Sequence, residues 1–125
     1  MKLLDGKLTG EILDGAVEVH RLLGPGLLES AYHTSLIREL QIRGFQVEAE
    51  VPVPLVYKEA SLDCGFRLDL VVEDRVVVEL KAVERILPLH EAQLLTYLRL
   101  FRRRVGLLIN FNSTPLRSGF RRFVL

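Results

Sequence analysis

The sequence has little or none of three features that would mark a secreted or membrane protein. It contains one cysteine among 125 residues, Cys64, so no disulfide can form within the chain, which favours a reducing, cytoplasmic environment. No apolar run approaches the ~20 residues that a transmembrane helix needs. Charged residues occur within the first seven positions, which is not expected of a secretory signal. We therefore expect a cytoplasmic protein without membrane association, in which Cys64 packs as a small apolar group.

Acidic residues are missing from the last quarter of the chain. Residues 92–125 contain no Asp or Glu but seven arginines, so the preceding part is net acidic although the whole chain has a formal charge of +1. Clustered arginines are the electrostatic signature of phosphate contact. Two interpretations remain open: the arginines bind nucleic acid, or they have a structural role, either as a solvated basic face or in pairs with acids from the first half of the chain. They are Arg99, Arg102, Arg103, Arg104, Arg117, Arg121 and Arg122.

Length and composition predict a single domain over residues 1–125, with 49% hydrophobic and 26% charged residues, as is usual for a globular protein. Apolar spacing predicts helices over 9–23, 27–43 and 88–101 and extended segments over 45–51, 53–57, 67–82, 105–111 and 120–125. Thr9 is the expected N-cap of the first helix, and Leu28 belongs to the expected buried stripe of the second. Pro52 and Pro54 limit the segment that follows them to an edge strand or an irregular path. The segment 105–111 is expected to lie parallel to the preceding strand, because a helix connects the two.

Residues 67–82 form the centre of this pattern: two apolar strands joined by a tight, charged turn. Asp69 interrupts the first strand, and Glu79 and Lys81 flank Leu80 in the second. Because strand side chains alternate between two faces, Glu79 and Lys81 must point the same way. Burying three ionisable groups among valines and leucines is costly unless they pair or bind an ion. This cost indicates a site.

The length of the turn decides whether the two carboxylates can share a face. A two-residue turn at 74–75 would place Asp69 opposite Leu80, with its carboxylate facing away from Glu79. A three-residue loop at 73–75 would pair Asp69 with Glu79, because a one-residue slip reverses the facing of a whole strand. A shared site therefore requires the three-residue loop or a bulge, and we predict one of these two.

These residue types suit a hard divalent cation. Carboxylates and water favour Mg²⁺ or Mn²⁺ over zinc, which prefers His and Cys. A partly desolvated Lys81 can orient or deprotonate a water, or stabilise charge on a phosphoryl group. Glu29 can add a carboxylate from the second helix, and Gln93 can orient water or substrate from the third. The alternative is a buried Asp–Lys–Glu network that only holds the hairpin to its helices, and the spacing leaves both open.

Residues 26–32, Gly-Leu-Leu-Glu-Ser-Ala-Tyr, resemble the signature of the GxxExxY protein family, a branch of the PD-(D/E)XK nuclease superfamily. The resemblance extends over about residues 12–123. The other segments that carry it are 19–26, Asp69, 79–81, 90–93, 94–97 and 108–111. One position departs from the superfamily pattern, because Leu68 stands where a proline usually precedes the aspartate.

The resemblance implies an α/β fold with an αβββαβ nuclease core, in which helices flank a central mixed sheet. It also implies a divalent-metal site of Glu29, Asp69 and Glu79, with Lys81 as the catalytic lysine and Gln93 as an accessory residue. Candidate substrate contacts are Tyr32, His90, Tyr97, Arg102, Arg103 and Arg104; His90 and Tyr97 share a helical face with Gln93.

From these features we expect a nuclease that uses Mg²⁺, or Mn²⁺ in its place, to hydrolyse phosphodiester bonds of DNA, with RNA as the other candidate substrate. Nucleic-acid binding would be sequence-nonspecific unless a protein partner supplies specificity, because the chain has no room for a separate recognition domain. One alternative is a catalytically silent module that binds nucleic acid or a protein partner. Another is a homodimer in which the buried charges only specify packing.

Overall fold

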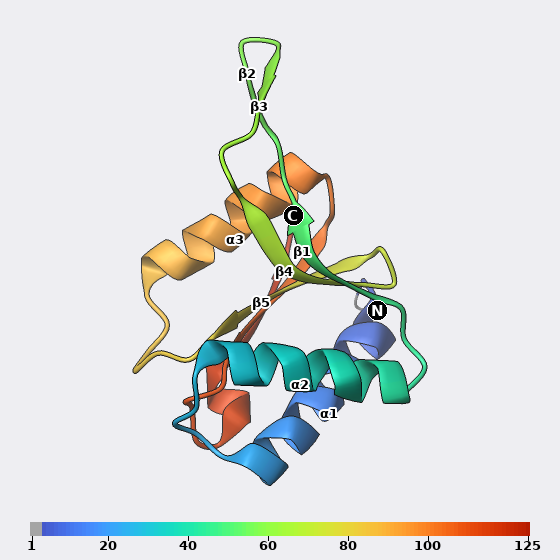
Figure 1. Cartoon of the computed structure of the whole chain (residues 1–125), viewed down its shortest axis with the longest axis vertical. Helices are drawn as coiled ribbons and strands as arrows, with labels where there is room; N and C mark the ends of the chain where they lie inside the picture. The colour runs from blue at the N-terminus through green and yellow to red at the C-terminus, as the bar shows by residue number, and fades with distance from the viewer. Residues whose placement is uncertain (1–3) are drawn as a thin grey trace.

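The valine-rich hairpin predicted from the sequence forms the middle of a five-stranded sheet (Figure 1). The computed structural model describes residues 4–125 and orders the strands β1-β4-β5-β6-β7. These strands are β1 (Val47–Pro52), β4 (Arg67–Val72), β5 (Val76–Lys81), β6 (Val105–Asn110) and β7 (Phe120–Val124), with a short 3-10 helix, η1 (Leu116–Gly119), before β7. The helices α1 (Gly6–Leu23) and α2 (Glu29–Ile42) cover one face, and α3 (Pro88–Phe101) covers the other. This mixed sheet flanked by helices confirms the predicted fold class.

Strand β5 is buried on both faces, which explains its continuous run of valines. Val76, Val78 and Leu80 pack in the core with α1 and α2, whereas Val77 packs in a second core with α3. All four side chains are fully buried, and such burial stabilises the fold by roughly 1.5–3 kcal/mol for each side chain. Strand β6 follows α3 and lies parallel to β5, as predicted.

The first two helices occupy the predicted part of the chain, but two details differ. Helix α1 begins at Gly6 with Asp5 as its N-cap, so the predicted N-cap at Thr9 is wrong. Thr9 lies inside the helix and donates its hydroxyl to the Gly6 carbonyl oxygen at 3.1 Å; the helix extends further because Leu8 still packs against the core. The prediction that Leu28 is buried is also wrong, since it is the extended N-cap of α2 and is 80% exposed.

Helix α3 packs closely on the sheet because Gly106 of β6 has no side chain. A Cβ at that position would lie 3.0 Å from the Cδ1 atoms of both Leu94 and Leu98. Both leucines are fully buried, and α3 begins at Pro88, as predicted. This packing holds a polar face of α3 beside β5. No helix in the described part of the chain is long and apolar enough to cross a membrane.

A separate hairpin of β2 (Leu55–Tyr57) and β3 (Ala60–Leu62) projects from the body of the molecule (Figure 1). Its turn is tight, because Ala60 already pairs with Tyr57. Strand β1 ends at Pro52 and lies at one edge of the main sheet, and the segment after it leaves that sheet to form the separate β2–β3 pair. Cys64 follows the hairpin and is exposed, so the prediction that it packs as an apolar group is wrong; its segment lies outside both cores.

Candidate active site

A three-residue loop joins β4 to β5, which is one of the two arrangements that a shared site requires. The closing pair of the hairpin leaves residues 73–75 unpaired, and the register places Asp69 opposite Glu79. Side chains bridge the two strands there. Glu79 Oε1 accepts a hydrogen bond from the Asp69 N–H at 3.2 Å, and Asp69 Oδ2 accepts one from the Leu80 N–H at 2.7 Å. The predicted register is confirmed, and it places the two carboxylates together.

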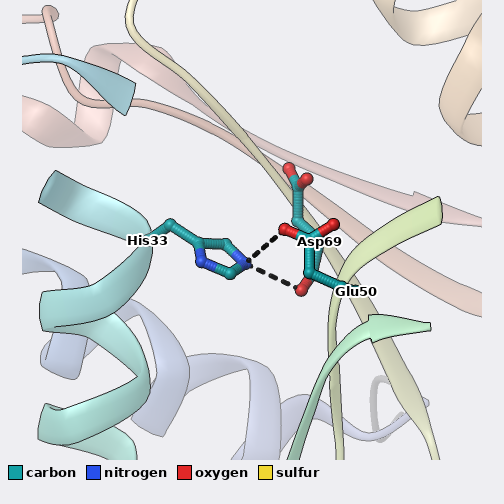
Figure 2. Close-up of side chains that lie close together, drawn as sticks. All are labelled: His33, Glu50 and Asp69. Atoms are coloured by element: carbon teal, nitrogen blue, oxygen red, sulfur yellow. Dashed lines mark hydrogen bonds and ion pairs between the residues drawn. The ribbon is translucent and has the colours of Figure 1, made fainter. Parts of the chain in front are cut away.

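Strand β1 is distorted opposite Asp69. The pairing of β1 with β4 omits the position where Glu50 would face Asp69, and Glu50 has a φ of 53°, which is uncommon for a residue other than glycine. A side chain from α2 occupies this position: His33 Nε2 lies 3.0 Å from the Asp69 carbonyl oxygen and 3.5 Å from Glu50 Oε1 (Figure 2). His33 therefore contacts the chain at Asp69 from the α2 side.

His33, Glu50 and Asp69 also offer donor atoms within 4.8 Å of one another, a grouping that can hold a metal ion. The contact with the Asp69 carbonyl argues against His33 Nε2 as a ligand atom in this arrangement. A carbonyl oxygen only accepts, so Nε2 must carry the hydrogen, whereas a ligating imidazole nitrogen needs a free lone pair. The carboxylates of this cluster remain as hard oxygen donors, and His33 supports the backbone beside them.

Glu29 and Lys81 line one cavity of about 270 Å³. Glu29 is the first residue of α2, where the helix dipole favours a carboxylate. Lys81 is the last residue of β5 and lies on the same face of the strand as Glu79. Two elements far apart in the sequence therefore place an acid and a lysine at a common opening.

Helix α3 contributes the third wall of the site. His90, Gln93 and Tyr97 line a smaller cavity together with Glu79 and Lys81. His90 Nδ1 accepts a hydrogen bond from the backbone N–H three residues earlier, at 3.0 Å. A neutral His90 therefore carries its proton on Nε2. The structure thus gathers the predicted residues of α3 and β5 around one small space.

The site carries more negative than positive charge, and the titration of its groups reflects this. Burial and the adjacent Asp69 carboxylate raise the pKa of Glu79 from its ordinary 4.5 to about 8. Loss of hydration, followed by repulsion from Asp69, raises the pKa of Glu29. Burial, Glu79 and Asp69 together raise the pKa of Tyr97, so its hydroxyl is protonated at neutral pH. Lys81 opposes both carboxylate shifts without cancelling them.

Tyr32 lies in the core and not at either cavity. Its side chain is fully buried, and its ring stacks on Phe111 with centroids 4.6 Å apart. Its hydroxyl donates to the Gly24 carbonyl oxygen at 2.6 Å and accepts from the Leu27 N–H at 3.1 Å. These contacts give Tyr32 a structural role in the loop before α2, and they leave its surface inaccessible to a substrate.

The arginines after α3 lie at the opposite end of that helix from His90. Arg103 Nη2 is 2.6 Å from Asp74 Oδ1, and its Nε donates to the Asp74 carbonyl oxygen at 2.9 Å. Arg104 Nε donates to the Leu125 carbonyl oxygen at 3.2 Å, and both Arg102 and Arg104 are exposed. Arg103 therefore pairs with an acid, as one alternative expected, but Asp74 lies just beyond the first half of the chain that this alternative named.

Sequence reasoning missed His33 and Glu50. His33 had a detectable signal, because it follows Glu29 by four residues and so shares its helical face. Glu50 had none, because its position opposite Asp69 depends on the register between β1 and β4, which are separated by the β2–β3 hairpin.

Comparison with known proteins gives one match. The family model described as the PD-(D/E)XK nuclease superfamily matches residues 6–123, which include every residue of the site. Neither the curated proteins nor the solved structures contain a significant match. Membership of the GxxExxY branch stays a prediction, because the matching model describes the superfamily. The chain belongs to the PD-(D/E)XK nuclease superfamily.

Proposed function

We propose that the protein is a divalent-metal-dependent nuclease that hydrolyses phosphodiester bonds of DNA, with RNA as the second candidate substrate. The observation that carries this proposal is the convergence of Asp69, Glu79 and Lys81 at the end of β5, beside Glu29 and Gln93. Family membership supports the same reaction class. A fold alone does not establish an activity, so the proposal depends on these side chains.

The donor set fits Mg²⁺, with Mn²⁺ as a substitute. Asp69 and Glu79 supply hard carboxylate oxygens side by side, and Glu29 lies at the adjoining cavity, while Mg²⁺ prefers oxygen ligands. The raised pKa values of Glu79 and Glu29 fit as well: burial raises both, repulsion from Asp69 adds to it, and a cation bound there would favour the charged carboxylates. A divalent ion held there supplies positive charge to a phosphoryl oxygen and makes water more acidic.

The chain's own residues then orient the reactants. Lys81 lines both cavities, and its ammonium group can hold a water by hydrogen bonding or stabilise negative charge on the phosphate. Gln93 offers both a donor and an acceptor to water or substrate. His90 through Nε2–H and Tyr97 through its protonated hydroxyl can donate hydrogen bonds to phosphate oxygens. We leave Tyr32 out of the proposed substrate contacts because it is buried.

Nucleic acid is the proposed substrate partner, bound without strong sequence preference. Arg102 and Arg104 remain proposed phosphate contacts, although they lie nine or more residues beyond Gln93, which corresponds to about 13 Å along a helix. A substrate longer than a dinucleotide is needed to reach both them and the cavity. A protein partner or a second copy of the chain is a further candidate for supplying specificity.

The decisive test is a cleavage assay on supercoiled plasmid, linear duplex, single-stranded DNA and RNA, each with Mg²⁺, Mn²⁺ or EDTA. We expect cutting that requires a divalent ion and that falls by about 10²–10⁴-fold in Lys81→Ala. The matched control is Lys58→Ala in the β2–β3 turn, which should cut like the wild type. Circular dichroism and thermal unfolding of both variants would exclude loss of the fold as the cause.

Undiminished cutting by Lys81→Ala would refute the assignment of the site. No cutting under any condition, combined with salt-sensitive binding of nucleic acid, would instead support the silent binding module. A rise in Tm on addition of Mg²⁺ would show that the preparation is folded and binds the ion, and so would distinguish a silent module from an inactive preparation.

A further inference from the structure

Two asparagines at the end of β6 hold the two chain segments that form the walls of the Glu29–Lys81 cavity. Asn110 is the last residue of β6 and is 1% exposed. Its Nδ2 donates to the Val83 carbonyl oxygen at 2.9 Å, and its Oδ1 accepts from the Val83 N–H at 3.0 Å. The side-chain amide therefore satisfies both backbone groups of one residue, just after Lys81. This is the pairing that a neighbouring strand would otherwise provide.

Asn112 makes the corresponding contact on the other segment. Its Oδ1 accepts a hydrogen bond from the Gly26 N–H at 3.1 Å, in the loop that leads into α2 and Glu29. Phe111, between the two asparagines, stacks on Tyr32, and its N–H donates to the Lys81 carbonyl oxygen at 2.9 Å. Three consecutive residues, the last of β6 and the two that follow it, thus contact both sides of the cavity.

Apart from His90, the residues that line the cavity adjoin these contacts. One wall is Leu27, Leu28 and Glu29, directly after Gly26; the other is Lys81, Ala82 and Val83. We propose that Asn110 and Asn112 are positioning residues that act as a clamp and set the separation of Glu29 and Lys81. The inference rests on the proposed function, for which these two side chains must meet the same substrate. A displacement of about 1 Å in such a site can cost about 10²-fold in rate.

Asn112 uses only its Oδ1 in this contact, whereas Asn110 uses both Oδ1 and Nδ2, which gives a sharp test with one type of substitution. Asn112→Asp keeps an oxygen acceptor for the Gly26 N–H and should behave like the wild type. Asn110→Asp loses the Nδ2–H donor to the Val83 carbonyl and places two acceptors against each other. We expect Asn110→Asp to lower kcat at least tenfold. A carboxylate buried at position 110 can also unfold the protein, so Asn112→Ala is the second variant. Asn112 is half-buried, and truncating its side chain should leave the fold intact.

The first readout is independent of activity: amide hydrogen exchange of the metal-free protein at residues 26–29 and 82–84. In Asn112→Ala we expect faster exchange at 26–29, with unchanged protection in α1 and α3 and restoration in Asn112→Asp. Unchanged exchange at 26–29 would overturn the clamp whatever the protein catalyses. Faster exchange supports it only together with the second readout.

The second readout separates positioning from a merely structural role. In Asn112→Ala, kcat should fall about tenfold while KM for the nucleic acid stays within twofold, and Asn112→Asp should restore kcat. Equal kcat in Asn112→Ala and wild type would overturn the clamp. If the wild type does not cleave, the proposed nuclease function fails, and the affinity for Mn²⁺ measured by calorimetry takes the place of kcat. Mn²⁺ affinity that is unaltered in Asn112→Ala, or absent in the wild type, would then overturn the clamp.

Discussion

The charged side chains are balanced in pairs at one end of strand β5 and unbalanced at the other. At the end that follows the 73–75 loop, Asp74 pairs with Arg103 at 2.6 Å and Arg75 pairs with Asp5 at 2.5 Å. At the other end, Glu79 lies beside the carboxylate of Asp69, and Lys81 does not balance the acids.

This difference separates a structural from a functional use of charge. Paired charges near the surface contribute modestly to stability, and they need no bound ion to balance them. A buried surplus of carboxylates is unfavourable in the free protein and becomes favourable only when a cation joins them. The strained φ of Glu50 next to Asp69 is consistent with this, because strain persists at sites that the surrounding structure holds in place.

The largest expected effect is a pH dependence of stability at the Glu79 end. The folded-state pKa of about 8 lies above the ordinary 4.5, so between these values the folded protein holds a proton that the unfolded chain has released. Stability that is fully present below about pH 4.5 is therefore lost as pH rises through about 8, by an amount on the order of a few kcal/mol.

Denaturant unfolding in EDTA from pH 5 to pH 9 would measure this loss. In Glu79→Gln most of this fall in stability with rising pH should disappear, whereas the control Glu59→Gln, at an exposed position, should show the same fall as the wild type. A wild-type stability that rises over this range would show that the Glu79 end does not carry the surplus charge.

The next largest effect is stabilisation by Mg²⁺, which should act through the same end of β5. A ligand that binds only the folded state adds about 2.7 kcal/mol at a concentration 100 times its Kd. We expect a rise in Tm with added Mg²⁺ for the wild type at pH 8 and none for Glu79→Ala. Asp74→Ala, at the other end, is the matched control and should keep the response. Equal responses of wild type and Glu79→Ala would place the ion elsewhere.

A smaller effect is expected from breaking the pair at the loop end. Arg103→Ala and Asp74→Ala should each lower the free energy of unfolding by about 1 kcal/mol, because each removes the ion pair. Arg103→Ala also removes the packing of Arg103 over the Phe101 ring. The double variant should show a positive coupling, measured by a double-mutant cycle. Cleavage per folded molecule should stay at the wild-type level. A large loss of kcat in either variant would contradict the assignment of a purely structural role to the charges at the loop end of β5.

The smallest effect concerns Arg102 and Arg104 as phosphate contacts. Replacing both by alanine should weaken nucleic-acid binding similarly for all sequences and lower the salt dependence of log K by about 1 for each phosphate that is no longer neutralised. Fluorescence anisotropy at several salt concentrations would measure it, with Arg38→Ala on α2 as the control. An unchanged salt slope would remove these arginines from the substrate path.

Much of the fold was predictable because it depends on local patterns. The run of valines in β5, Pro88 at the start of α3 and the parallel placement of β6 all follow from periodicity and chain connectivity. The errors arose where burial overrides local signals. Thr9 has the chemistry of an N-cap but lies inside a longer helix, and Cys64 is apolar enough to be buried but lies outside both cores.

The sequence by itself determined that Asp69 and Glu79 could share a face only through a three-residue loop or a bulge, because side chains alternate along a strand. It also predicted, through a recognisable order of motifs, the superfamily that the comparison confirmed. The contacts of His33, Glu50, Asn110 and Asn112 were decided only by the tertiary structure. These residues act across pairings between distant segments, and no local pattern in a chain records which distant backbone groups will need a partner.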